Sequence, residues 1–196
     1  MKEKNREEID YNTYNKGIEY FSKQKYEESI DCWEKILEKQ SDFRIFVYLG
    51  MCYFKINEHK KSIESYEKAI EINPKYSKAF NNLGNVYRKL GKFIEAIDYY
   101  NAAIRLAPNN VTYHYNLGIT YYDISLHKKA VNEFEQVLKA EPKNFEIRSD
   151  LVNAYYRLDE YEKALELLKE NLKFCANSKN KNQIKAKIKF IKNLLA

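Results

Sequence analysis

The sequence of 196 residues is 44% hydrophobic and 32% charged, and it contains only five glycines and three prolines. This composition excludes a disordered chain, and the scarcity of turn-forming residues excludes a loop-rich all-β protein. The net charge is +6, but residues 179–196 hold six lysines and no acid. Residues 1–178 are therefore neutral, and the charge is no evidence of a basic surface over the body of the protein.

Residues 1–9 are predicted to form a polar extension ahead of the folded part of the chain. No window reaches the ~20 apolar residues of a membrane helix, so neither a signal peptide nor an anchor is predicted. Cys32, Cys52 and Cys175 are far apart and show no CxxC spacing. Such cysteines are typical of buried, reduced thiols rather than of a disulfide framework. Both observations favour a cytoplasmic location.

A fixed period runs through most of the sequence. Pro74, Pro108 and Pro142 follow one another at intervals of 34 residues. Glycine, leucine, tyrosine and small residues recur with the same step. They are Gly50, Gly84 and Gly118; Leu49, Leu83, Leu117 and Leu151; Tyr53, Tyr87, Tyr121 and Tyr155; and Ser62, Ala96, Ala130 and Ala164. A period of this size indicates stacked supersecondary units.

The period predicts five repeats followed by a basic C-terminal helix. The repeats are expected at 10–42, 43–76, 77–110, 111–144 and 145–178, and the basic helix at 179–196. The first and fifth repeats are weaker copies, because Ser41 stands in place of the first proline and Val152 in place of the fifth glycine. Terminal repeats are expected to be atypical, since one side of each faces solvent.

Each repeat is predicted to be a pair of helices. In the third repeat, apolar residues at helical spacing predict helices over 79–90 and 93–106, with Gly91 as the break and Pro108 as the stop. Gly84 and Ala96 are expected where the paired helices cross, and Tyr100 is expected to fill the space between them. A bulky replacement of either small residue would overpack this crossing, at a cost of about 1–3 kcal/mol.

The last segment has one apolar stripe, formed by Ile184, Ile188, Ile191 and Leu195. This stripe is expected to cover the fifth repeat, with the lysines facing water. A basic amphipathic helix could instead contact nucleic acid, an anionic membrane or an acidic protein. Phe190 is the one aromatic residue among the lysines and no nucleic-acid motif is present, so a solvated cap is favoured over these partners.

The sequence L-G-x-x-Y, then A-x-x-x-Y/F, then P, at a period of 34, resembles the tetratricopeptide repeat family. Residues 81–110 carry this pattern almost throughout, and the resemblance covers about residues 10–178. It implies an all-α, right-handed superhelical solenoid of about five helix-turn-helix repeats plus a C-terminal capping helix. It also implies that the first helix of each repeat lines a concave groove that binds a peptide or protein segment.

The inner positions that the resemblance implies are rich in asparagine, tyrosine and basic residues. An asparagine can both donate to and accept from a peptide backbone, and aromatic rings are good interface anchors. The predicted peptide-binding residues are Asn81, Asn82, Asn85 and Asn116 for backbone hydrogen bonds, Tyr48, Tyr115 and Tyr122 as anchors, and Arg88 and Lys89 for acidic side chains.

Charge along the implied groove is polarised. Basic residues lie in the second and third repeats, whereas Asp123, Glu146 and Asp150 lie in the fourth and fifth. The family's carboxylate clamp for acidic chaperone C-termini needs cations where Glu146 and Asp150 stand, and no other register fits. The acidic chaperone C-terminus is therefore not an expected partner.

No catalytic constellation is apparent, so an enzyme is not predicted and no cofactor or metal is expected. His59, His114 and His127 occupy positions where packing explains them, and no His or Cys pair has zinc-ligand spacing. No phosphate loop or nucleophile elbow occurs. The predicted function is that of a scaffold or adaptor for an unidentified protein partner. Binding through the basic helix and self-association remain as alternatives.

Overall fold

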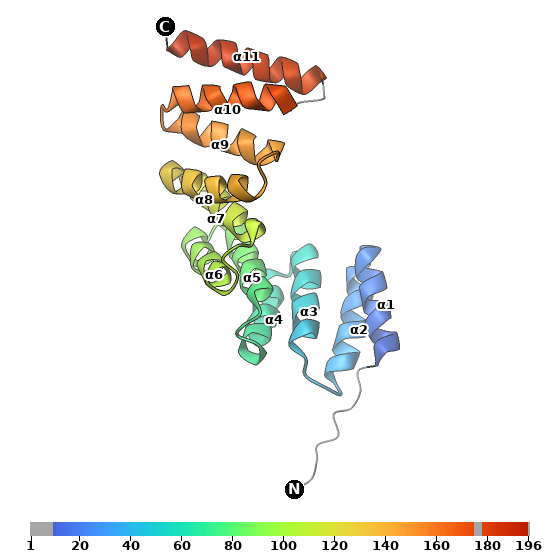
Figure 1. Ribbon diagram of the computed structural model, residues 1–196. Coiled ribbons are helices and arrows are strands. Elements are labelled where there is room, and N and C mark those ends of the chain that lie inside the picture. The colour runs from blue at the N-terminus through green and yellow to red at the C-terminus, as the bar shows by residue number, and fades with distance from the viewer. Residues whose placement is uncertain (1–9, 175–177, 196) are drawn as a thin grey trace. The chain divides into compact units, whose positions relative to one another are not determined.

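The computed structural model describes residues 10–174 and 178–195, and every regular element in these residues is an α-helix (Figure 1). The predicted all-α class is confirmed, with two helices in each repeat and one beyond. The helices are α1 Tyr11–Ser22, α2 Tyr26–Leu37, α3 Phe43–Lys55, α4 His59–Ile72, α5 Ser77–Lys89, α6 Phe93–Leu106, α7 Val111–Asp123, α8 His127–Ala140, α9 Phe145–Arg157, α10 Tyr161–Phe174 and α11 Ser178–Leu194.

The helices belong to two compact units. The N-terminal unit contains α1 to α6 and ends at Ala107, and the C-terminal unit begins at Pro108 and contains α7 to α11. Within each unit, every helix packs against the next one along the chain. Each unit is therefore a short stack of helix pairs, as expected for a repeat solenoid.

The turn inside each repeat depends on one residue in the left-handed region of backbone conformation. Gly91 has φ 73°, and the same repeat position in the other four has φ between 58° and 63°. Those four residues are Gln24, Asn57, Ser125 and Asp159. A left-handed residue commonly ends a helix, because it lets the chain reverse while the last carbonyls stay hydrogen-bonded. The predicted break at Gly91 is thus one instance of a general feature.

Glycine allows the paired helices to cross closely in the first four repeats. A Cβ atom added at Gly84 would lie 2.7 Å from Cε1 of Tyr100, which confirms the predicted crossing. The equivalent pairs are Gly17 with Trp33, Gly50 with Tyr66, and Gly118 with Phe134. In the fifth repeat Val152 and Leu168 occupy these two positions, and both are buried. A larger residue on one helix is thus matched by a smaller one on the other.

The C-terminal helix α11 closes the core of its unit. Ile184 and Ile191 are buried in the same cluster as Leu151 and Leu168, and Ile188 packs against it. The predicted stripe ends there, because Leu195 follows the last helical residue and is 42% exposed. The helix begins at Ser178, one residue before the predicted boundary.

The two cysteines that the structure describes, Cys32 and Cys52, are buried free thiols, as predicted. Burial raises the pKa of the Cys52 thiol, which keeps it protonated and unreactive. The predictions for Cys175 and for the extension at 1–9 lie outside the described residues.

Candidate binding face

The predicted asparagines of α5 make hydrogen bonds inside the protein. Asn81 is only 6% exposed, and its Nδ2 donates to Oδ1 of Asn82 at 3.4 Å. The hydroxyl of Tyr100 donates to Oδ1 of Asn85 at 2.7 Å. The side chain of Asn82 also lies close to the hydroxyl of Tyr66, whose pKa is raised by burial. The side-chain oxygen of Asn85 is thus already engaged, which leaves its Nδ2 as the group that can donate to a ligand.

This arrangement gives the asparagines a role that sequence reasoning missed. Tyr66 and Tyr100 fill the crossings at Gly50 and Gly84, and each buried hydroxyl needs a polar partner. The signal was present in the sequence, because Asn85 lies in the same repeat as Tyr100 and Asn82 lies in the repeat that follows Tyr66. Trp33 and Phe134, which lack a hydroxyl, occupy the same position in other repeats.

The basic pair at the end of α5 is accessible. Lys89 is exposed and Arg88 is half-buried, and both lie in the last turn of the helix. Cations in this position also interact favourably with the helix dipole, so their presence alone does not require a ligand.

Tyr48 belongs to an aromatic cluster of the first two repeats. Its ring stacks on Trp33 with centroids 4.7 Å apart and meets Tyr14 edge-on at 6.1 Å. The Tyr48 ring is therefore engaged in packing and is only partly exposed. Tyr48 packs against the buried cluster that contains Trp33, whereas the buried residues Leu83 and Val86 of α5 belong to a separate cluster.

The three predicted residues of the C-terminal unit lie on α7. Tyr115 donates from its hydroxyl to Oδ2 of Asp150 at 3.2 Å, and burial raises the pKa of that carboxyl. Asn116 is half-buried, and the ring of Tyr122 lies 5.0 Å from that of His127. The predicted site therefore divides into one group in the N-terminal unit and another on α7.

A pocket of about 340 Å³ lies in the C-terminal unit, between α7, α9 and α11. Its lining is aromatic and basic, and of the predicted site residues it contains only Tyr122. The lining residues are Tyr122, Asn153, Tyr156, Arg157, Lys187 and Phe190. Tyr156, Arg157 and Asn153 are inner positions by the repeat pattern. Lys187 and Phe190 were missed because they belong to the final helix, for which the repeat supplies no positions.

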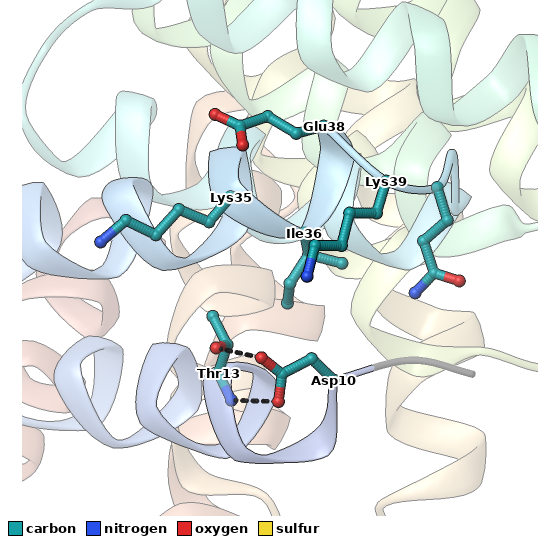
Figure 2. A pocket seen from close by; sticks show the side chains of 7 residues that line it. Asp10, Thr13, Lys35, Ile36, Glu38 and Lys39 are labelled. Atoms are coloured by element: carbon teal, nitrogen blue, oxygen red, sulfur yellow. Dashed lines mark hydrogen bonds between the residues drawn. The ribbon is translucent and has the colours of Figure 1, made fainter. Parts of the chain in front are cut away.

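A second hollow, of about 550 Å³, lies between the start of α1 and the end of α2 (Figure 2). Figure 2 shows that Asp10 uses its carboxylate to cap α1, because Thr13 donates to it from its backbone nitrogen and from Oγ1. These bonds lower the pKa of Asp10. The other lining residues are Lys35, Ile36, Glu38, Lys39 and Gln40, which carry charges of both signs. The hollow therefore has the character of a helix-capping region.

The histidine contacts agree with the packing role. Nδ1 of His114 lies 2.7 Å from Oε2 of Glu133, and Nε2 lies 2.7 Å from the carbonyl of Pro108. His59 and His127 pack against the rings of Phe54 and Tyr122. Within residues 10–174 and 178–195, no group of three or more His, Cys, Asp or Glu side chains could hold a metal ion.

Comparison with known families agrees with the repeat geometry. Residues 50–91 and 84–125 match a family model described as TPR repeat, and residues 126–173 match one described as tetratricopeptide repeat. The chain belongs to the tetratricopeptide repeat family. The family models match its second to fifth repeats, so the predicted membership is confirmed.

Two further comparisons describe relatives of this tetratricopeptide repeat protein. It is 35% identical over 63 residues to the mitochondrial import receptor subunit TOM70 of Saccharomyces cerevisiae, a stretch that is 32% of this chain and 10% of that protein. Its fold is similar to a crystal structure of MamA protein, with a TM-score of 0.75, 22% identity, and coverage of 84% and 90% of the two chains. MamA from Desulfovibrio magneticus RS-1 has a TM-score of 0.76 at 16% identity, with 84% and 93% covered. At these identities the likeness to MamA shows the fold alone.

None of the helices within 10–174 and 178–195 combines the length and the apolar character that crossing a bilayer requires.

Proposed function

We propose that this protein is a non-catalytic scaffold or adaptor that binds a segment of another protein along the first helices of its repeats. Tetratricopeptide repeats generally mediate protein–protein interaction, and the two import-receptor sequences are described as subunits of a receptor. We also propose a cytoplasmic location, because Cys32 and Cys52 are buried free thiols rather than a disulfide.

The observation that carries the proposal is the character of the first-helix surface. α5 presents the amide groups of Asn82 and Asn85 beside Lys89, and α7 presents Tyr122 at a pocket. The buried hydroxyl of Tyr100 fixes the side chain of Asn85, so its amide is pre-organised. Pre-organised polar groups and accessible aromatic rings each favour binding of another protein.

Affinity capture from the source lysate, with charge-matched variants, tests this proposal. Lys89→Glu changes an exposed residue of a first helix, and Arg105→Glu makes the same charge change on the second helix α6. Neither side chain is buried, so both variants are expected to fold as the wild type does. A partner retained by Arg105→Glu and lost by Lys89→Glu would support binding along the first helices. Equal capture by all three proteins would contradict it.

A second candidate function belongs to the lysine face of α11. Lys185, Lys189 and Lys192 are exposed, and the helix contains no acidic residue. Such a face could attract nucleic acid or an anionic membrane. Since Ile184 and Ile191 are buried in the core, the apolar stripe is not available to enter a membrane. This candidate predicts binding that falls steeply with salt and is lost in Lys185→Glu/Lys189→Glu.

A further inference from the structure

We propose that the pocket between α7, α9 and α11 binds a carboxylate from an acidic segment of a partner protein, with an apolar side chain of that segment against Tyr156 and Phe190. This inference rests on the proposed function and specifies the chemistry of the partner. The sequence had placed the basic half of the groove in the second and third repeats, whereas this pocket makes a basic site at the C-terminal end.

Lys187 is the first reason for the proposal. Its side chain is half-buried against the C-terminal unit, and its Nζ donates to Oδ1 of Asn153. Asn153 is neutral, and none of the described residues that line the pocket is acidic. Burial lowers the pKa of Lys187, because the charged form has lost water without gaining a counter-charge. A bound carboxylate would supply that charge.

Arg157 supplies a second cation to the same pocket. It lies in the last turn of α9, where the helix dipole also favours a positive charge, and its side chain is exposed to an incoming ligand. The nearby Tyr122 hydroxyl raises the pKa of Arg157, so the guanidinium stays charged beside the pocket. A guanidinium has donors that match the two oxygens of a carboxylate.

The rings beside these cations select for an apolar neighbour of the carboxylate. The Tyr156 and Phe190 rings lie 6.2 Å apart at an angle of 43°, and Phe190 is 52% exposed. Phe190 thus presents an aromatic ring to solvent beside Tyr156, among the exposed lysines of α11. Aromatic residues next to an arginine are enriched where a few side chains dominate binding energy.

The same features favour a carboxylate over the phosphates of a nucleic acid. A nucleic-acid backbone needs a row of cations that follows successive phosphates. Here two cations converge on one pocket of about 340 Å³, whereas Lys185, Lys189 and Lys192 of α11 do not line it. The geometry therefore fits one acidic group and its apolar neighbour.

Fluorescence anisotropy with defined peptides tests the assignment. The probe is a fluorescein-labelled peptide of alternating glutamate and phenylalanine separated by glycine, and the control is the same peptide with glutamine in place of glutamate. Each is made with a free and with an amidated C-terminus. The full chain is expected to bind the glutamate peptide about tenfold or more tightly than the glutamine peptide, because charge-assisted hydrogen bonds are lost in the control. If amidation of the C-terminus weakens binding as much as replacing glutamate with glutamine does, the ligand group is instead the C-terminal carboxylate.

Matched variants place the binding. Lys187→Met and Arg157→Gln are each expected to weaken the binding of the glutamate peptide by about tenfold. Lys185→Met, which removes an exposed lysine from the same helix, is expected to leave its binding unchanged. The melting temperature of Lys187→Met should not fall, because the buried charge is uncompensated in the free protein.

Three results would overturn the assignment. The first is that the glutamate peptide does not bind. The second is that it binds but Lys187→Met leaves its affinity unchanged. The third is that a labelled single-stranded oligonucleotide binds to the wild type and not to Lys187→Met. None of these decides the proposed function, because capture of a partner through Lys89 is a separate measurement.

Discussion

In the N-terminal unit, the fourth residue of the first helix is Phe46 in the second repeat and Phe80 in the third, whereas in the C-terminal unit it is His114 and Arg148. Phe46 packs against the buried cluster that contains Trp33 and against the one that contains Tyr66. Arg148 is buried, and it donates to the carbonyl of Pro142 and to Oε2 of Glu170. The same repeat position is thus filled by apolar packing in one unit and by hydrogen bonds in the other.

This difference shows which part of the repeat the fold determines. His114 contacts the carbonyl of Pro108 as Arg148 contacts that of Pro142, so both tie the helix to the turn before it. A buried polar side chain is tolerated there because its partners are present. The repeat pattern determines the position of this side chain. The hydrogen-bond partners available nearby determine whether an apolar or a polar side chain can occupy it.

The largest effect is expected when Arg148 is removed. Arg148→Ala leaves the Pro142 carbonyl without its side-chain donors and creates a cavity, so we expect a loss of about 2–3 kcal/mol in the free energy of unfolding. Arg148→Phe copies the N-terminal unit and should lose less, because packing is restored. Urea denaturation measures both. A loss below about 0.5 kcal/mol for Arg148→Ala, as at an ordinary surface position, would show that the contacts are dispensable.

A smaller effect is expected at the crossing of the third repeat. Gly84→Val places a Cβ atom against the buried ring of Tyr100 and should destabilise the protein by about 1–3 kcal/mol. Adding Tyr100→Leu copies the pair Val152 and Leu168 of the fifth repeat and should recover part of this loss. A double-mutant cycle by chemical denaturation measures the coupling, and simple additivity of the two changes would contradict the complementarity.

The smallest effect is expected at Asp150. Burial raises its pKa above the ordinary value of 3.8, so the folded state holds the proton more tightly than the unfolded state. Stability therefore falls as the pH rises above 3.8 through the folded pKa, and the penalty is fully present above that pKa. Asp150→Asn keeps an acceptor for Tyr115 and removes the charge, so a gain of less than about 1 kcal/mol is expected at pH 7.

Thermal unfolding of Asp150→Asn at pH 4 and pH 7 checks this sign. The difference between variant and wild type should grow with pH. A variant that is less stable than wild type at pH 7 would mean that the ionised carboxylate is favoured by its surroundings instead.

The sequence predicted the fold well because each repeat is specified by local signals. The glycine at the crossing, the left-handed residue after the first helix (Gly91 in the third repeat) and the proline after the second helix recur at fixed spacing, and each has a local physical cause. Contacts between side chains of different helices carry no such spacing. The contact of Lys187 with Asn153 depends on side-chain rotamers and on the packing of α11, so the sequence did not reveal it.

Photo-crosslinking from two tyrosine positions tests the central claim most directly. Benzoylphenylalanine replaces Tyr122, on the first helix α7 at the pocket, or Tyr99, on the second helix α6. After irradiation in lysate, we expect the Tyr122 position to crosslink to one acidic protein segment and the Lys187→Met substitution to abolish the product. Crosslinks that arise only from the Tyr99 position, or that Lys187→Met leaves unchanged, would contradict binding at the first helices of the C-terminal unit.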